Sequence, residues 1–184
     1  MTVVRITVTG SGPVSSTGWN AEGPVTTAKL STDDGGTSAV YSPTSGDNMY
    51  FLMDVSPIPD GATINSVTFG ASVSKLDPVD ALTRNTIKVG GNTYESGNFS
   101  PSVANTYQYT TSTAPYTFST NPSNGSAWTK SALAATQNGL KKENGAGQRC
   151  SYLFADVDYT GGPSGPAIKR YDGSSFVDVV AVVI

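Results

Sequence analysis

Six aspartates are the side chains of this sequence whose type and spacing could do chemistry. Four of them could supply the carboxylate oxygens that Ca²⁺ prefers: Asp33, Asp34, Asp47 and Asp54. Two others stand two residues apart, as a pair of glycosidase carboxylates could: Asp156 and Asp158. The first four lack the fixed spacing of a calcium loop, and the pair fits ordinary alternation along the wet face of a strand. We therefore expect turn acids and solvent-facing acids, and no metal site.

Other catalytic groups are scarce. The 184 residues include no histidine, which removes the commonest general base and metal ligand, and a single cysteine, Cys150, which excludes an intrachain disulfide and a Cys-based zinc site. No serine lies in a nucleophile motif, and neither Gly90-Gly91 nor Gly161-Gly162 precedes a helical segment, so phosphate-binding loops are excluded. We expect no catalytic residue, no cofactor and no enzyme activity, with Cys150 buried in the core.

Aromatic side chains leave one binding function open. Six of them could form a platform for a sugar ring: Trp19, Tyr94, Tyr107, Tyr109, Tyr116 and Trp128. Aromatic residues of β-rich proteins are more often core or interface anchors, so core packing is the competing interpretation.

Charge and composition exclude other classes of function. Charged residues are 14% of the chain, the net charge is -3, and no Lys/Arg cluster exceeds a pair, so we expect no nucleic-acid partner. The N-terminus has no secretion signal, and no apolar run approaches the ~18 residues that span a bilayer. We expect a soluble protein made in a reducing cytoplasm, without a membrane partner.

Strands dominate the predicted elements. The low charge, abundant β-branched residues and many turn residues favour an all-β protein. Alternating apolar residues predict strands at 4–8, 106–110, 115–119 and 151–160, with Pro115 indicating an edge, and a hairpin joining 87–89 to 92–95. Weaker strands are expected near 25–30 and 39–41, and Asp33-Asp34-Gly35-Gly36 indicates a turn between them.

A central antiparallel pair and one helix complete the expected domain. The runs 49–55 and 67–73 flank a turn rich in Pro, Asp and Gly, and we expect them to pair with each other. Trp128–Gly139 is the one predicted helix, with Thr129 as N-cap and Gly139 as C-cap, followed by a polar loop from Lys141 to Gln148. The expected fold is an antiparallel two-sheet sandwich, jelly-roll-like, with one short helix and long loops.

The C-terminal segment has a different character. Residues 1–160 form the predicted sandwich domain, 161–166 a Gly/Pro linker or turn, and 167–184 a hairpin or strand. The last nine residues include seven large apolar side chains, which need cover from this chain's core or from a neighbouring chain. We expect assembly contacts from both ends of the chain: Val4, Ile6, Val8, Phe176, Val179, Val180, Val182 and Ile184.

Several stretches resemble one class of protein. The order of "PIPDGATINSVTF", "SAWTKSALAATQNGL" and "YLFADVDYT", with the later "IKRYDGSSFVDV", resembles jelly-roll-like β-sandwich modules of tailed-bacteriophage virion proteins, over roughly residues 19–178. The resemblance implies capsid decoration (cement), a head fibre or a tail appendage, and transfers no functional residue to this sequence.

The expected function follows from that resemblance. The leading hypothesis is a non-enzymatic virion structural protein that stabilises the head as a cement protein. It would be made in the host cytoplasm, form a homo-oligomer, favouring a trimer, and bind other virion proteins such as the major capsid protein. The alternative is a tail fibre or appendage module that binds a host-surface glycan.

Overall fold

The protein is a β-sandwich made of two antiparallel sheets. The computed structural model describes residues 2–10, 13–21, 26–76, 81–112, 115–145, 147–162, 168–171 and 176–179. Its helical elements are short: the 3₁₀ helices η1 (Thr27–Lys29) and η2 (Thr110–Ser112) and the helix α1 (Lys130–Ala134). None of the helices in these ranges is long and apolar enough to cross a membrane. The all-β prediction is confirmed.

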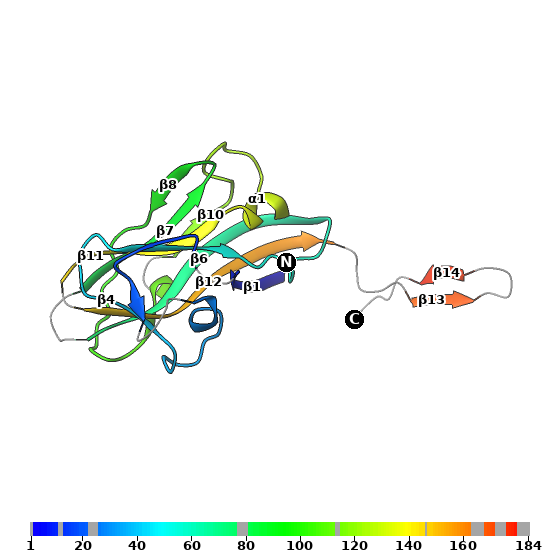
Figure 1. Ribbon diagram of the computed structural model, residues 1–184. Coiled ribbons are helices and arrows are strands. Elements are labelled where there is room, and N and C mark those ends of the chain that lie inside the picture. Colours follow the sequence, from blue (N-terminus) through cyan, green and yellow to red (C-terminus); the bar gives the residue numbers. More distant parts are fainter. Residues whose placement is uncertain are drawn as a thin grey trace.

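The first sheet, here called sheet A, is built on the two longest strands (Figure 1). These are β6 (Ala62–Lys75) and β12 (Gln148–Gly161), which pair along nearly their whole length. The far edge of β12 pairs with β4 (Val40–Ser42) at its start and with β1 (Thr2–Thr9) towards its end. Three short strands complete the sheet: β3 (Asn20–Ala21) on β4, and β9 (Gln108–Tyr109) and β10 (Tyr116–Phe118) on β6.

The second sheet, sheet B, contains five strands of its own among the residues that the structure describes. They are β2 (Ser15–Thr17), β5 (Asn48–Met53), β11 (Gln137–Gly145), β7 (Ala81–Val89) and β8 (Asn92–Glu95). Strand β1 joins the two sheets, because Thr2–Thr7 pair with β12 while Val8 and Thr9 pair with β5.

The core lies between the inner faces of the two sheets. Alternate residues of each strand point into it, as the period of two along a strand requires. Four apolar residues of β6 are fully buried, which confirms the predicted inward face: Val67, Phe69, Ala71 and Val73. Cys150 is also fully buried, as predicted, and this burial raises the pKa of its thiol to about 12. The β7–β8 hairpin at Gly90-Gly91 is confirmed, and β10 pairs only with β6 among the described strands.

The predicted pairing of the two central runs is wrong. Both runs are strands, β5 and β6, but they do not pair with each other: β5 belongs to sheet B and β6 to sheet A. The segment between them crosses from sheet B to sheet A, with Gly61 at φ +75° and Ile58 only 1% exposed. Apolar faces meet across the core as well as side by side within a sheet, so the pattern alone does not distinguish the two arrangements.

The predicted helix is much shorter than expected. Thr129 does cap it, because its side chain accepts a hydrogen bond from the Ala132 amide at 3.0 Å. The helix ends at Ala134, however, and Gln137 begins β11, so neither the C-cap at Gly139 nor the polar loop at 141–148 is correct. Ladders with β5 and β7 on both sides of β11 outweigh the local helix signals. The weak strand near 25–30 is likewise replaced by η1, whereas β4 occupies the other predicted position.

The C-terminal segment forms a hairpin. Strand β13 (Ile168–Tyr171) pairs with β14 (Phe176–Val179), and the pair makes a separate two-stranded sheet (Figure 1). Val180, Val182 and Ile184 lie outside the described residues.

Candidate functional site

A row of side chains crosses the outer face of sheet A near one end. Arg149 of β12 has Tyr41 of β4 as its partner on one side and Ser74 of β6 on the other. Tyr107 immediately precedes β9, whose Gln108 pairs with Val73 of β6. Strands β4 and β9 are three inter-strand spacings apart in sheet A, so their backbones are separated by roughly 14 Å. Strand β12, which carries Arg149, lies between them.

A groove of about 520 Å³ opens along this row. We call it the Tyr41–Tyr107 groove. Both tyrosines line it, together with Arg149, Lys29, Leu76 and residues 36–40. Its volume lies within the range of about 300–1,000 Å³ that is typical of small-molecule sites.

A loop built around Asp34 forms one wall of the groove. The Asp34 carboxylate accepts hydrogen bonds from the amides of Gly36 at 3.0 Å and Ser38 at 2.8 Å. Burial works against ionisation of Asp34, but the hydrogen bonds from the loop outweigh it and lower the pKa of the carboxyl group. Gly36 has φ +92°, and a Cβ there would clash with the ring of Tyr107. The backbone of Gly36 therefore packs directly against the ring of Tyr107, a close contact that only glycine permits.

The opposite wall uses glycine in a similar way. A Cβ on Gly147 would lie 2.5 Å from the ring of Tyr41, so the ring is held close to the backbone that leads into β12. Burial raises the pKa of Tyr107 above its usual value, so its hydroxyl, already protonated at neutral pH, also resists ionisation at alkaline pH. Both tyrosines are half-buried, so each ring is fixed by packing yet still reaches the groove.

The charge in the groove comes from Arg149 and Lys29. The guanidinium of Arg149 makes no hydrogen bond or ion pair with any residue that the structure describes. The other two arginines with described side chains are both paired: Arg5 with Asp156 at 2.7 Å, and Arg84 with Glu95 at 3.0 Å. Arg149 therefore leaves its guanidinium donors available to a ligand.

The six aromatic residues that the sequence suggested as a sugar platform lie in different parts of the structure. Trp19 and Trp128 are 2% and 3% exposed and belong to the core. Tyr94 and Tyr116 pack against Phe118 at ring-centroid distances of 6.4 and 4.8 Å. Tyr109 lies on the outer face of sheet A, edge-on to Phe154, and hydrogen-bonds Asp33. Of the six, Tyr107 is the one that lines the groove.

The aspartates considered for calcium make separate hydrogen bonds. Asp47 accepts from the Ser42 hydroxyl, Asp54 from the Ser56 amide, and Asp33 and Asp34 have the partners given above. Across the described part of the chain, no group of three potential ligands could hold a metal ion. Asp156 and Asp158 point outward from β12 as predicted, and Asp156 is paired with Arg5.

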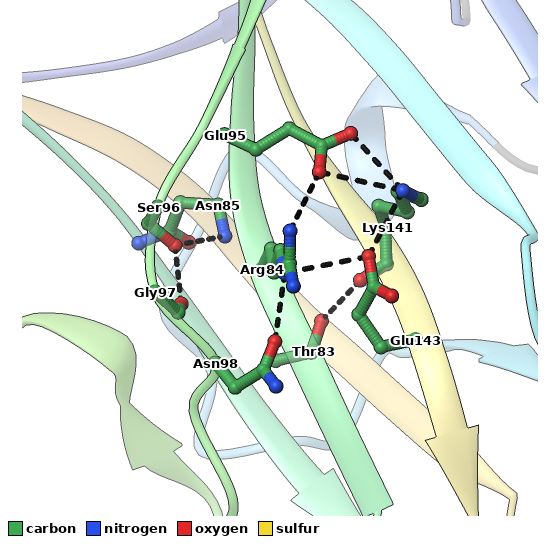
Figure 2. A network of polar contacts seen from close by, with 9 residues as sticks. All are labelled: Thr83, Arg84, Asn85, Glu95, Ser96, Gly97, Asn98, Lys141 and Glu143. Atoms are coloured by element: carbon green, nitrogen blue, oxygen red, sulfur yellow. Dashed lines mark hydrogen bonds and ion pairs between the residues drawn. The ribbon is translucent and has the colours of Figure 1, made fainter.

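A second polar cluster lies on the outer face of sheet B (Figure 2). Lys141 contacts Glu95 at 3.1 Å and Glu143 at 2.9 Å, and Arg84 contacts the same two acids. Asn98 accepts a further hydrogen bond from Arg84 at 2.7 Å. Two cations and two carboxylates thus satisfy one another, which leaves little for a ligand and marks the cluster as a structural network joining β7, β8 and β11.

The residues expected to make assembly contacts occupy different environments. Ile6 and Val8 are 1% and 3% exposed and pack inside this chain's own core, with Val4 packed partly against it. Phe176 and Val179 are the first and last residues of β14. A role in assembly for any of these five residues stays a prediction.

Sequence reasoning missed Arg149, Tyr41 and Lys29 as site residues. Tyr41 and Arg149 are separated by 108 positions and meet only because β4 pairs with β12. The available signal was alternation: Cys150 points inward, so its neighbour Arg149 must point outward. Nothing in the sequence, however, indicates which strand lies beside it.

Comparisons with known proteins add two fold neighbours. No protein-family model and no curated protein matches the chain. A carbohydrate-binding module (CBM6cm-2) from Cellvibrio mixtus lichenase 5A, solved with cellotriose, is 15% identical with a TM-score of 0.45, over 88% of this chain and all of the other. Truncated AlyQ, with CBM32 and alginate lyase domains, is 12% identical with a TM-score of 0.45, over 91% of this chain and 37% of that one. Likeness at this level says nothing of what this chain binds.

Proposed function

We propose that this protein is a non-catalytic glycan-binding domain whose ligand lies in the Tyr41–Tyr107 groove. One observation carries the proposal: an arginine without an acidic partner lies between two half-buried tyrosines in a groove of about 520 Å³. Sugar rings have apolar C–H faces that stack on aromatic rings, and hydroxyl groups that accept hydrogen bonds from a guanidinium. Few, well-placed polar groups among aromatic walls are typical of such sites.

The test is binding of oligosaccharides by isothermal titration calorimetry, with single substitutions in the groove. Tyr107→Ala should weaken binding of any responding glycan at least tenfold, because the ring supplies stacking area. Tyr159→Ala is the matched control, since Tyr159 is also half-buried in sheet A but lies at the opposite end of β12. Equal affinity of wild type and the Tyr107 variant would place the ligand elsewhere or end the proposal.

Attachment to a virion remains part of the proposed biology. A tail fibre or appendage that carries this domain would use the groove to hold a host-surface glycan. Such a protein is present in few copies per particle and binds whole host cells. Tyr107→Ala should then reduce adsorption of the particle to its host without changing particle assembly.

Capsid decoration is the second candidate, and the C-terminal hairpin favours it. Strands β13 and β14 pair with each other and with no other described strand, so their outer edges are available to another chain. In this case the hairpin joins the protein to the major capsid protein or to further copies of itself, a trimer being the favoured oligomer.

Removal of residues 167–184 tests the second candidate. The truncated chain should remain folded, lose its oligomeric mass in light scattering and fail to bind heads. Retention of both properties would place the assembly surface elsewhere. Counting copies per particle by gel densitometry separates the two candidates, because a cement protein covers the head in many copies.

A further inference from the structure

Arg149 has an unusual electrostatic environment for this chain. The protein carries a net charge of -3, yet the two charged side chains that line the groove, Arg149 and Lys29, are both cationic. Arg149 is half-buried, so its charge is screened by solvent less than that of a fully exposed arginine.

The two acids of the neighbouring loop, Asp33 and Asp34, bond to other groups and not to the guanidinium of Arg149. Asp34 is the carboxylate closest to the groove along the loop, and it accepts hydrogen bonds from the Gly36 and Ser38 amides. Asp33, one residue earlier, hydrogen-bonds the Tyr109 hydroxyl outside the groove. Neither acid forms an ion pair with Arg149, so the guanidinium is held ready for an anion that comes from outside the chain.

A guanidinium has a preferred anionic partner. Its planar fork of N–H donors matches the two oxygens of a carboxylate, and the paired hydrogen bonds are stronger than those between neutral groups. With Tyr41 and Tyr107 on either side, the ligand that satisfies all three residues has a carboxylate attached to a sugar ring. We propose, building on the glycan-binding function above, that the groove selects acidic sugars and that Arg149 binds their carboxylate.

Matched pairs of glycans isolate the carboxylate. We would titrate the protein with tetragalacturonate and its methyl ester, and with 3′-sialyllactose and its methyl ester, by calorimetry at low ionic strength. The members of each pair differ in the presence of a free carboxylate, so the two arms separate a uronic acid from a sialic acid. Lactose carrying a 6-sulfate serves as an anion without a carboxylate.

The expected result is at least tenfold tighter binding of the acidic member of one pair, equivalent to about 1.4 kcal/mol. Arg149→Gln should remove this preference, because it weakens binding of the acidic member much more than binding of the neutral member. Arg149→Lys should retain part of the preference, because it keeps the charge but lacks the fork. Circular dichroism of both variants verifies that the sandwich remains folded.

The outcomes distinguish this inference from the function on which it rests. Neutral and acidic members that bind equally well, with loss of both in Tyr107→Ala, would overturn the acidic-sugar inference and leave glycan binding intact. An equal preference for 6-sulfated lactose would overturn the assignment to a carboxylate. Failure of every glycan in the panel to bind would overturn both proposals.

Discussion

Phe69 is a core residue that packs against two other aromatic rings. Its side chain is fully buried, and its ring centroid lies 6.3 Å from those of Phe118 and Trp128. Phe69→Ala should lower the free energy of unfolding by about 3–5 kcal/mol, since the cavity removes contacts with both rings. Urea denaturation measures the loss, and Leu52→Ala, at a side chain that is 37% exposed, should cost far less. A loss below about 1 kcal/mol at Phe69 would contradict its burial.

The thiol of Cys150 should be chemically silent in the folded protein. Burial raises its pKa to about 12, so the reactive thiolate is scarce at neutral pH and the sulfur is also inaccessible. Iodoacetamide at pH 8 should label the urea-unfolded chain and leave the native chain unmodified, as mass spectrometry will show. Because the folded pKa is raised, this residue's contribution to stability is present at neutral pH and is lost as the pH rises towards 12. Rapid labelling of the native protein would contradict the burial.

At the scale of elements, Gly139 separates the helix interpretation from the observed strand. In β11 a Cβ at this position would clash with the carbonyl oxygen of Met49 on the neighbouring strand. Gly139→Ala should therefore destabilise the protein by about 1–3 kcal/mol in thermal or urea unfolding. Gly97→Ala is the matched control, because a Cβ at Gly97 meets no atom within 4 Å. A neutral or stabilising effect at Gly139 would contradict the strand assignment.

Elements were predictable where apolar alternation marks the core face of a strand, and less so where partners decide the structure. Val67, Phe69, Ala71 and Val73 alternate with small polar residues, so β6 could be placed from its own sequence. The pairing of β5, the strand character of β11 and the groove all depend on segments distant in the chain. Arg149 could be assigned to an outer face from alternation, but its neighbour Tyr41 could not.

The whole molecule should unfold as one unit through residue 162. Strand β1 pairs with both sheets, and the two sheets share a single buried core that includes Trp19 and Trp128. Tryptophan fluorescence and far-ultraviolet circular dichroism should therefore report the same midpoint in urea. Separate transitions would mean that the sheets are independent units and that β1 does not couple them.

The Asp34 loop makes the groove a convenient place to change specificity. Its shape is set by its own backbone: the Asp34 carboxylate accepts from two loop amides, and Gly36 lies against Tyr107. Thr37 is exposed, and the strands of sheet A carry the stability of the fold elsewhere. Natural variation or laboratory selection can therefore exchange Thr37 while Asp34 and Gly36 stay fixed. Proteins with different ligands could then share the same β-sandwich and differ only in the exposed part of this loop.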